Sequence, residues 1–151
     1  MIRIICVGKL KENYFKEAIK EYSKRLEKYT KLEIIELMDE GITDINKALK
    51  LEGEKISKHL NEKDYIITLE IDGKQLTSKE LANLIDQKQI TNSNITFVIG
   101  GSYGISDEVK QKSSYHLSFS KMTFPHQLFR VILLEQIYRS FKINNNESYH
   151  K

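Results

Sequence analysis

The sequence predicts an α/β fold: an open, mainly parallel sheet with helices on both faces. Short apolar segments alternate along the chain with longer stretches that have helical periodicity. The composition, with 40% hydrophobic and 30% charged residues, is that of an ordinary globular protein. No repeat or Pro/Gly/Ser-rich linker divides the 151 residues, so we expect a single domain over residues 1–151.

Five segments rich in apolar residues are typical of strands buried in a parallel sheet. Gly8 closes the first segment, Gly100-Gly101 closes the fourth, and the turn signal Asp72-Gly73 is expected to end the third. The predicted strands are residues 2–7, 32–38, 64–71, 95–99 and 115–119.

Five further segments carry apolar residues at helical spacing or helix-start signals. We expect Thr77 to cap the third helix and Ser106 to cap the fourth. Pro125 suits the first turn of the fifth helix, with Thr123 as a possible cap nearby. The predicted helices are residues 12–28, 44–59, 78–89, 106–113 and 126–141.

The last predicted helix is apolar on more than one side, which one sheet face does not explain. Such a helix is either deeply buried or shared with a partner, and a homodimer is the economical interpretation. Its apolar residues are Leu128, Phe129, Val131, Ile132, Leu133, Leu134, Ile137, Tyr138 and Phe141.

Composition also limits the partners and the compartment. The net charge of +3 leans weakly towards anionic partners, and the C-terminal part is its more basic portion. Apolar runs such as 131–134 are too short to cross a bilayer, and the N-terminus lacks a signal-peptide pattern. The single cysteine, Cys6, fits a buried position in a reducing compartment. We therefore expect a cytoplasmic protein without a membrane partner.

A glycine-rich segment, residues 97–106, joins a buried strand to a capped helix. Its glycines allow positive φ and let a ligand approach backbone amides, although a purely structural turn is an equal alternative. The spacing matches neither a P-loop nor a dinucleotide fingerprint. Ligands in open α/β sheets bind beyond the carboxyl ends of the strands, which directs attention to residues 69–73, 100–104 and 118–126.

Two further motifs lie near the C-terminus. Residues 117–130 combine a strand end, a loop of hydroxyl and apolar side chains, and His126 and Arg130 four apart on one helix. Alone, His126 also fits a surface or capping role, and Glu135 with Arg139 fits a helix-stabilising ion pair. The tail, residues 147–151, is either disordered or suited to RNA by stacking and phosphate contact.

The chain resembles the RlmH family of SPOUT-class methyltransferases, the large-subunit rRNA pseudouridine N3-methyltransferases. The resemblance runs along the whole chain and is densest around the three motifs above. It rests on Val7-Gly8-Lys9-Leu10-Lys11, Glu21-Tyr22, Arg25-Leu26, Thr68-Leu69, Gly73-Lys74, Phe97-Val98-Ile99-Gly100-Gly101, Leu117-Ser118, Met122-Thr123-Phe124-Pro125-His126, Arg130, Glu135-Gln136, Tyr138-Arg139 and Tyr149-His150-Lys151.

This resemblance implies a C-terminal trefoil knot that forms a pocket for S-adenosyl-L-methionine, a homodimer, and 23S rRNA of the assembled ribosome as substrate. It implies methylation at N3 of a pseudouridine. By position, the implied cofactor-binding residues are Leu69, Gly100, Gly101, Phe119, Ser120, Lys121, Met122, Thr123 and Phe124.

A sulfonium donor is already activated, so we expect no metal; the four histidines lie far apart in the sequence. The target N–H must lose its proton, and His126 or His150 is our candidate base. Arg130, Arg139 or Lys151 would stabilise developing negative charge or bind phosphate. Tyr149 would stack on or hydrogen-bond the target base. These five positions (His126, Arg130, Arg139, Tyr149 and His150) are the predicted catalytic residues.

Three alternatives remain open. The chain could be a non-catalytic ribosome-associated binding or assembly factor, or a SPOUT enzyme acting on another RNA such as tRNA. A flavodoxin-like or receiver-type module is suggested by fold class alone. A receiver would need clustered acidic residues at strand ends, whereas Asp39 and Asp72 are isolated.

Overall fold

The computed structural model describes residues 1–151 and contains one five-stranded sheet in the order β2-β1-β4-β3-β5. Every pairing between neighbouring strands is parallel, which confirms the predicted α/β class. The strands are β1 (Ile2–Val7), β2 (Leu32–Leu37), β3 (Tyr65–Gln75), β4 (Ile95–Ile99) and β5 (Tyr115–Ser118).

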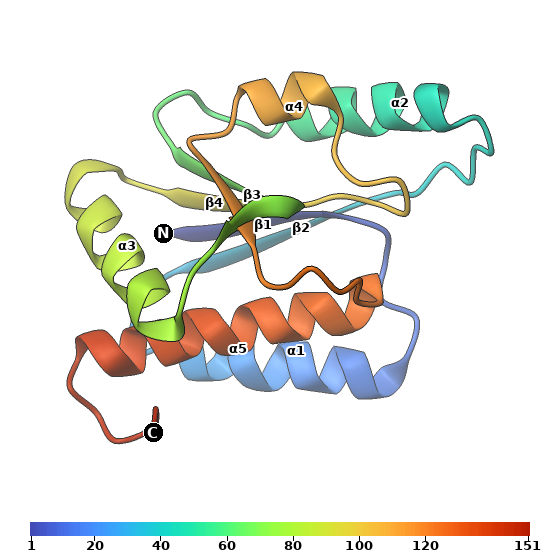
Figure 1. The fold of residues 1–151 in the computed structure, drawn as a ribbon. Helices are drawn as coiled ribbons and strands as arrows, with labels where there is room; N and C mark the ends of the chain where they lie inside the picture. Colours follow the sequence, from blue (N-terminus) through green and yellow to red (C-terminus); the bar gives the residue numbers. More distant parts are fainter.

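Helices cover both faces of this sheet (Figure 1). Helices α1 and α5 lie side by side below the sheet, α3 packs against α5, and α2 and α4 lie together above the sheet. The helices are α1 (Asn13–Leu26), α2 (Ile45–Ser57), α3 (Ser78–Thr91), α4 (Asp107–Gln111) and α5 (His126–Asn144).

The two faces of the sheet build two apolar cores because successive side chains of a strand point to opposite sides. In β1, Ile4 and Cys6 enter the core under α1, α3 and α5, whereas Ile5 and Val7 enter the core under α2 and α4. Burial raises the pKa of the Cys6 thiol to about 11. Coverage on both faces explains why β1 and β4 are buried along nearly their whole length.

The expected end of the third strand at Asp72-Gly73 is wrong, because β3 continues to Gln75. Leu69 and Lys74 both pair with Leu117 of β5, so the residues between them form a bulge. A Cβ on Gly73 would lie 2.8 Å from the carbonyl carbon of His116. The glycine therefore permits close approach of two strands rather than a chain reversal.

Two of the three expected helix caps are confirmed. The Thr77 hydroxyl accepts the backbone N–H of Glu80 at 3.1 Å in a complete capping box, and Ser106 caps α4. The cap expected from Thr123 is wrong: Pro125 occupies the N-cap position of α5, and no side chain bonds there. Because proline has no backbone N–H, no unpaired donor is left at this position.

Packing within the chain accounts for many of the apolar residues of α5. Its buried residues form one broad face that packs against the sheet, α1 and α3. Leu128, Val131 and Ile132 remain partly or fully exposed, and the homodimer stays a prediction. None of the helices combines the length and apolarity needed to traverse a bilayer.

Candidate active site

A cavity of about 360 Å³ lies where the bulge of β3 meets the loops that follow β4 and β5. Its volume falls within the range of small-molecule sites, and its place is the one expected for open α/β sheets. Eight of the nine predicted cofactor-binding residues line it, whereas Lys121 is exposed and does not. The eight are Leu69, Gly100, Gly101, Phe119, Ser120, Met122, Thr123 and Phe124.

One side of the cavity is aromatic. The ring of Phe129 packs edge-on against Phe119 with centroids 5.1 Å apart and is stacked with Phe124 at 5.8 Å. Ile99 and Leu117, from the ends of β4 and β5, extend this apolar wall. A flat, weakly polar ring such as a nucleobase suits such a surface.

Another part of the cavity wall is a turn that requires glycine. A Cβ on Gly100 would lie 2.3 Å from the carbonyl oxygen of Gly104, and Gly104 itself has φ +86°. Gly101 and Gly104 pair across the turn as an isolated bridge. The turn therefore presents bare backbone to the cavity.

Glu52, on α2, is a buried carboxylate behind this turn that sequence reasoning missed. A Cβ on Gly101 would lie 2.8 Å from its Oε1, and that oxygen has no hydrogen-bond partner. Burial, followed by the charge of Asp39, raises the pKa of Glu52. The signal was present: Ala48, Glu52 and Ile56 are spaced four apart, which places Glu52 on the buried face.

Polar groups at the bulge of β3 form one edge of the cavity. Glu70 and Lys110 both line it, with Lys110 Nζ 3.8 Å from Glu70 Oε1. Glu70 Oε2 contacts the buried hydroxyl of Thr68 and Nδ1 of His116. None of these side chains was assigned a role beforehand, although Glu70 lies within the segment 69–73 and Thr68 is among the residues that carry the resemblance. Glu70 directly follows Leu69, so its place in the segment 69–73 was the available signal.

The predicted catalytic residues fall in three places. His126 is exposed and lines the cavity at the start of α5. Arg130 is 1% exposed and does not line it. Its Nη1 donates to Glu36 Oε2 at 2.7 Å and its Nη2 to the carbonyl of Gly8 at 3.0 Å, while Nε has no partner. The structure therefore does not bring Arg130 to the cavity with His126.

Arg139, Tyr149 and His150 form a separate cluster, named here the tail cluster, with Glu135. Arg139 Nε donates to Glu135 at 2.9 Å, and its Nη1 lies 3.1 Å from His150 Nδ1. Its guanidinium lies 4.8 Å from the Tyr149 ring centroid. The hydrogen bond to Glu135 raises the pKa of Arg139, and burial raises the pKa of Tyr149.

The C-terminal tail is anchored rather than free. Glu147 Oε2 accepts from Lys142 at 2.9 Å, and its Oε1 accepts the hydroxyl of Tyr29 at 2.8 Å. Both hydrogen bonds lower the pKa of Glu147, to about 2. The ring of Tyr149 then packs edge-on against Tyr138 of α5.

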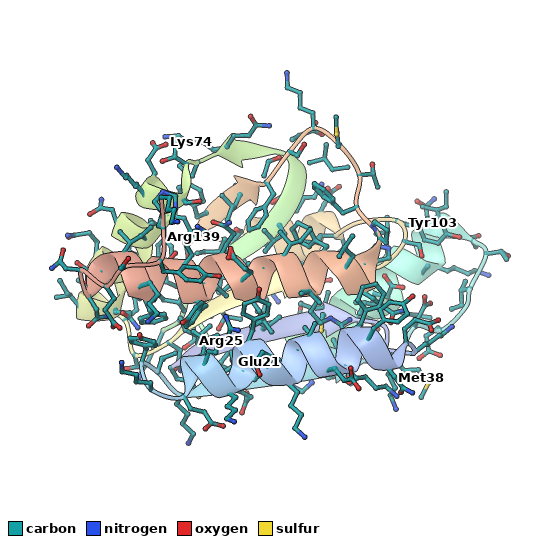
Figure 2. The ribbon with its side chains drawn as sticks, turned by 90° about the horizontal axis from the view of Figure 1, so that it is seen from below. Glu21, Arg25, Met38, Lys74, Tyr103 and Arg139 are labelled. Atoms are coloured by element: carbon teal, nitrogen blue, oxygen red, sulfur yellow. The ribbon has the colours of Figure 1, made fainter.

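The cavity and the tail cluster lie at opposite ends of α5 within one chain. Thirteen residues separate His126 from Arg139, which corresponds to about 20 Å along a helix. Figure 2 shows Arg139 towards one end of α5 and Tyr103, another cavity residue, towards the other. One chain thus does not unite the two groups of predicted residues. No three His, Cys, Asp or Glu side chains are grouped to hold a metal ion.

Comparisons with known proteins point to one family. The family model described as "Predicted SPOUT methyltransferase" matches residues 1–150. The "Ribosomal RNA large subunit methyltransferase H" of Clostridium novyi (strain NT) is 57% identical, with 99% of each chain covered. The protein of that name from Caldicellulosiruptor saccharolyticus is 49% identical, with 100% of each chain covered.

A solved structure shows the same fold at low sequence identity. The structure of "a probable methylase family protein from Haemophilus influenzae Rd KW20" superposes with a TM-score of 0.59 and 16% identity. The match covers 99% of this chain and 70% of that chain.

Proposed function

Because the chain belongs to the SPOUT methyltransferases and, among them, to the ribosomal RNA large subunit methyltransferase H family, we propose that it methylates N3 of a pseudouridine in 23S rRNA. The methyl donor in this proposal is S-adenosylmethionine, and the substrate is the assembled ribosome in the cytoplasm. Membership of the SPOUT class implies the C-terminal trefoil knot. The observation that supports the proposal is the convergence of the three predicted segments, around residues 69, 100–101 and 119–124, on one cavity.

The residues of the cavity fit an adenosyl sulfonium. The aromatic wall of Phe119, Phe124 and Phe129 suits the base, and the turn at Gly100 and Gly101 offers backbone groups. The cofactor supplies a methyl group already activated on sulfur. The chain's own task is to hold the substrate nitrogen in line and exclude water, which alone contributes several kcal/mol.

We assign acceptance of the substrate proton to His126, which lines the cavity, and name His150 as the second candidate. We assign Arg139 and Lys151 to the negative charge of the base or the backbone phosphates, and Tyr149 to stacking on the base. Arg130 acts differently in this proposal. Its contacts with Glu36 and Gly8 make it a positioning residue for the loop after β1.

A homodimer would join the cavity of one copy to the tail cluster of the other. Leu128, Ile132, Glu135 and Arg139 are spaced four, three and four apart, so they form one stripe along α5. This stripe is at least partly exposed and runs from the cavity end to the tail cluster. Antiparallel packing of two such stripes about a two-fold axis would bridge the distance of about 20 Å.

The test is transfer of a labelled methyl group from S-adenosylmethionine to whole ribosomes, isolated subunits and tRNA, followed by mass spectrometry of nucleosides. We expect methylpseudouridine in 23S rRNA of whole ribosomes. His126→Ala and His150→Ala, singly and together, should slow turnover with cofactor saturated. His59→Ala is the matched control, because His59 lies outside the cavity and the tail cluster.

Each alternative has its own result. Labelling confined to tRNA would move the activity to another RNA. Calorimetry without any uptake of S-adenosylmethionine would favour the non-catalytic binding factor. Full turnover of the double histidine variant would remove the proposed base. A strictly monomeric chain with full activity would refute the shared site.

A further inference from the structure

The carboxyl group of Glu70 lies on the cavity wall, in the bulge of β3 that directly follows Leu69. Its side chain is only 14% exposed. A carboxylate accepts hydrogen bonds and donates none, and it is costly to remove from water without donors. The hydrogen-bond donors that the protein supplies to Glu70 therefore show which carboxylate oxygen remains available for a ligand in the cavity.

One carboxylate oxygen is fixed by the protein. The hydroxyl of Thr68, which is fully buried, donates to Glu70 Oε2 at 2.6 Å. Nδ1 of His116 contacts the same oxygen, and the hydroxyl of Ser113 lies 2.7 Å from that of Thr68. The three neighbours hold the carboxylate in one orientation, as a rigid site requires.

The other oxygen is left free. Glu70 Oε1 accepts no hydrogen bond from the protein, and its nearest cation, Lys110 Nζ, is 3.8 Å away, beyond hydrogen-bond length. Lys110 also lines the cavity. The cavity edge thus holds an oriented acceptor with capacity for one or two donors from a ligand.

Resting on the proposed function, we propose that Glu70 determines specificity by accepting hydrogen bonds at Oε1 from the ribose hydroxyls of the adenosyl group. The base belongs against the apolar wall of Phe119 and Phe129. The methionyl ammonium would be repelled by the nearby Lys110. The ribose joins those two parts and carries neutral donors on adjacent carbons, which matches the free oxygen.

Isothermal titration calorimetry with four ligands tests this contact. S-adenosylhomocysteine carries the whole nucleoside, 5′-methylthioadenosine lacks the amino acid, and the 2′- and 3′-deoxy forms of methylthioadenosine lack one hydroxyl each. We expect Glu70→Ala to weaken the first two ligands by the same factor, about 10- to 100-fold. Glu70→Gln should lose less, because it keeps an acceptor oxygen.

The deoxy ligands isolate the contact. Removal of one hydroxyl should weaken binding to the native chain by about 10-fold and leave binding to Glu70→Ala unchanged. Glu108→Gln is the matched control. Glu108 is exposed on α4, its Oε1 lies 3.8 Å from Lys112 Nζ, and it does not line the cavity. Glu108→Gln should therefore bind all the ligands with native affinity.

Several outcomes would overturn the proposal. Native affinity in Glu70→Ala would exclude the contact, and weakening of S-adenosylhomocysteine alone would move it to the amino acid. Equal loss of the hydroxyl effect in Glu108→Gln would show a general change. A native chain that binds no nucleoside ligand would instead refute the proposed function. Thermal unfolding of each variant checks the fold, and Glu70→Gln decides the matter if Glu70→Ala does not fold.

Discussion

Removing Glu36 should destabilise the protein more than removing Arg130, although the two side chains form one ion pair. Arg130 Nη1 lies 2.7 Å from Glu36 Oε2, but the exposed fractions of the two side chains differ, at 2% and 35%. Glu36→Ala leaves a buried guanidinium with only the carbonyl of Gly8 as partner. It also removes the acceptor for the backbone N–H of Leu10.

The magnitudes follow from this asymmetry. An uncompensated buried charge costs about 3–5 kcal/mol, and because Glu36 is partly exposed we expect Glu36→Ala to cost about 3 kcal/mol. Arg130→Met removes the buried charge and keeps an apolar stem. Glu36 can then hydrate and still accept from Leu10, so we expect a cost of about 1–2 kcal/mol. The loss of unfolding free energy in the double variant should be smaller than the sum of the two single losses, because no buried charge remains.

Urea unfolding followed by circular dichroism measures these free energies, at several protein concentrations so that any dimer contribution is separated. The difference between the two single variants should also appear as a lower melting temperature for Glu36→Ala, by about 2–4 °C per kcal/mol. A larger cost for Arg130→Met would refute the reasoning. So would an unchanged stability in Arg130→Met with methyl transfer abolished, since the arginine would then act on the substrate.

Three other predictions concern separate parts of the molecule. Gly100→Ala should abolish binding of S-adenosylhomocysteine in calorimetry, because its Cβ would lie 2.3 Å from the backbone oxygen of Gly104 and the turn must open; native affinity would contradict this. The hydrogen bond to Lys142 lowers the folded-state pKa of Glu147 from 4.5 to about 2. The contribution of Glu147 to the free energy of unfolding is therefore present above pH 4.5 and is lost as the pH falls to about 2. The unfolding free energies of the native chain and Glu147→Gln should therefore converge over that range, and a constant difference would argue against the pair. Burial raises the pKa of Cys6 from 9.0 to about 11, so the unfolded thiol ionises first and stability should fall as pH rises from 9 to 11, a fall that Cys6→Ala should lack.

Much of the fold could be predicted from local sequence patterns. The apolar run of residues 95–99 and the box formed by Thr77 and Glu80 depend on neighbours within a few residues, so each can be interpreted without knowledge of the rest of the chain. The predicted strand end at residues 72–73 was wrong because the glycine there depends on a distant segment. Gly73 is required by the backbone of β5, which lies more than forty residues further along.

The sequence by itself determined the alternation of strands and helices, the coverage of both faces of the sheet, and the three segments that line the cavity. Tertiary structure alone decided the environment of individual side chains. Arg130 and Glu36 are 94 residues apart, so helical spacing that linked Arg130 to His126 carried no information on its true partner. The free oxygen of Glu70 and the distance from cavity to tail cluster depend likewise on contacts between distant segments. Periodicity reports which face of an element is buried, whereas the neighbours found there are set by how the elements pack.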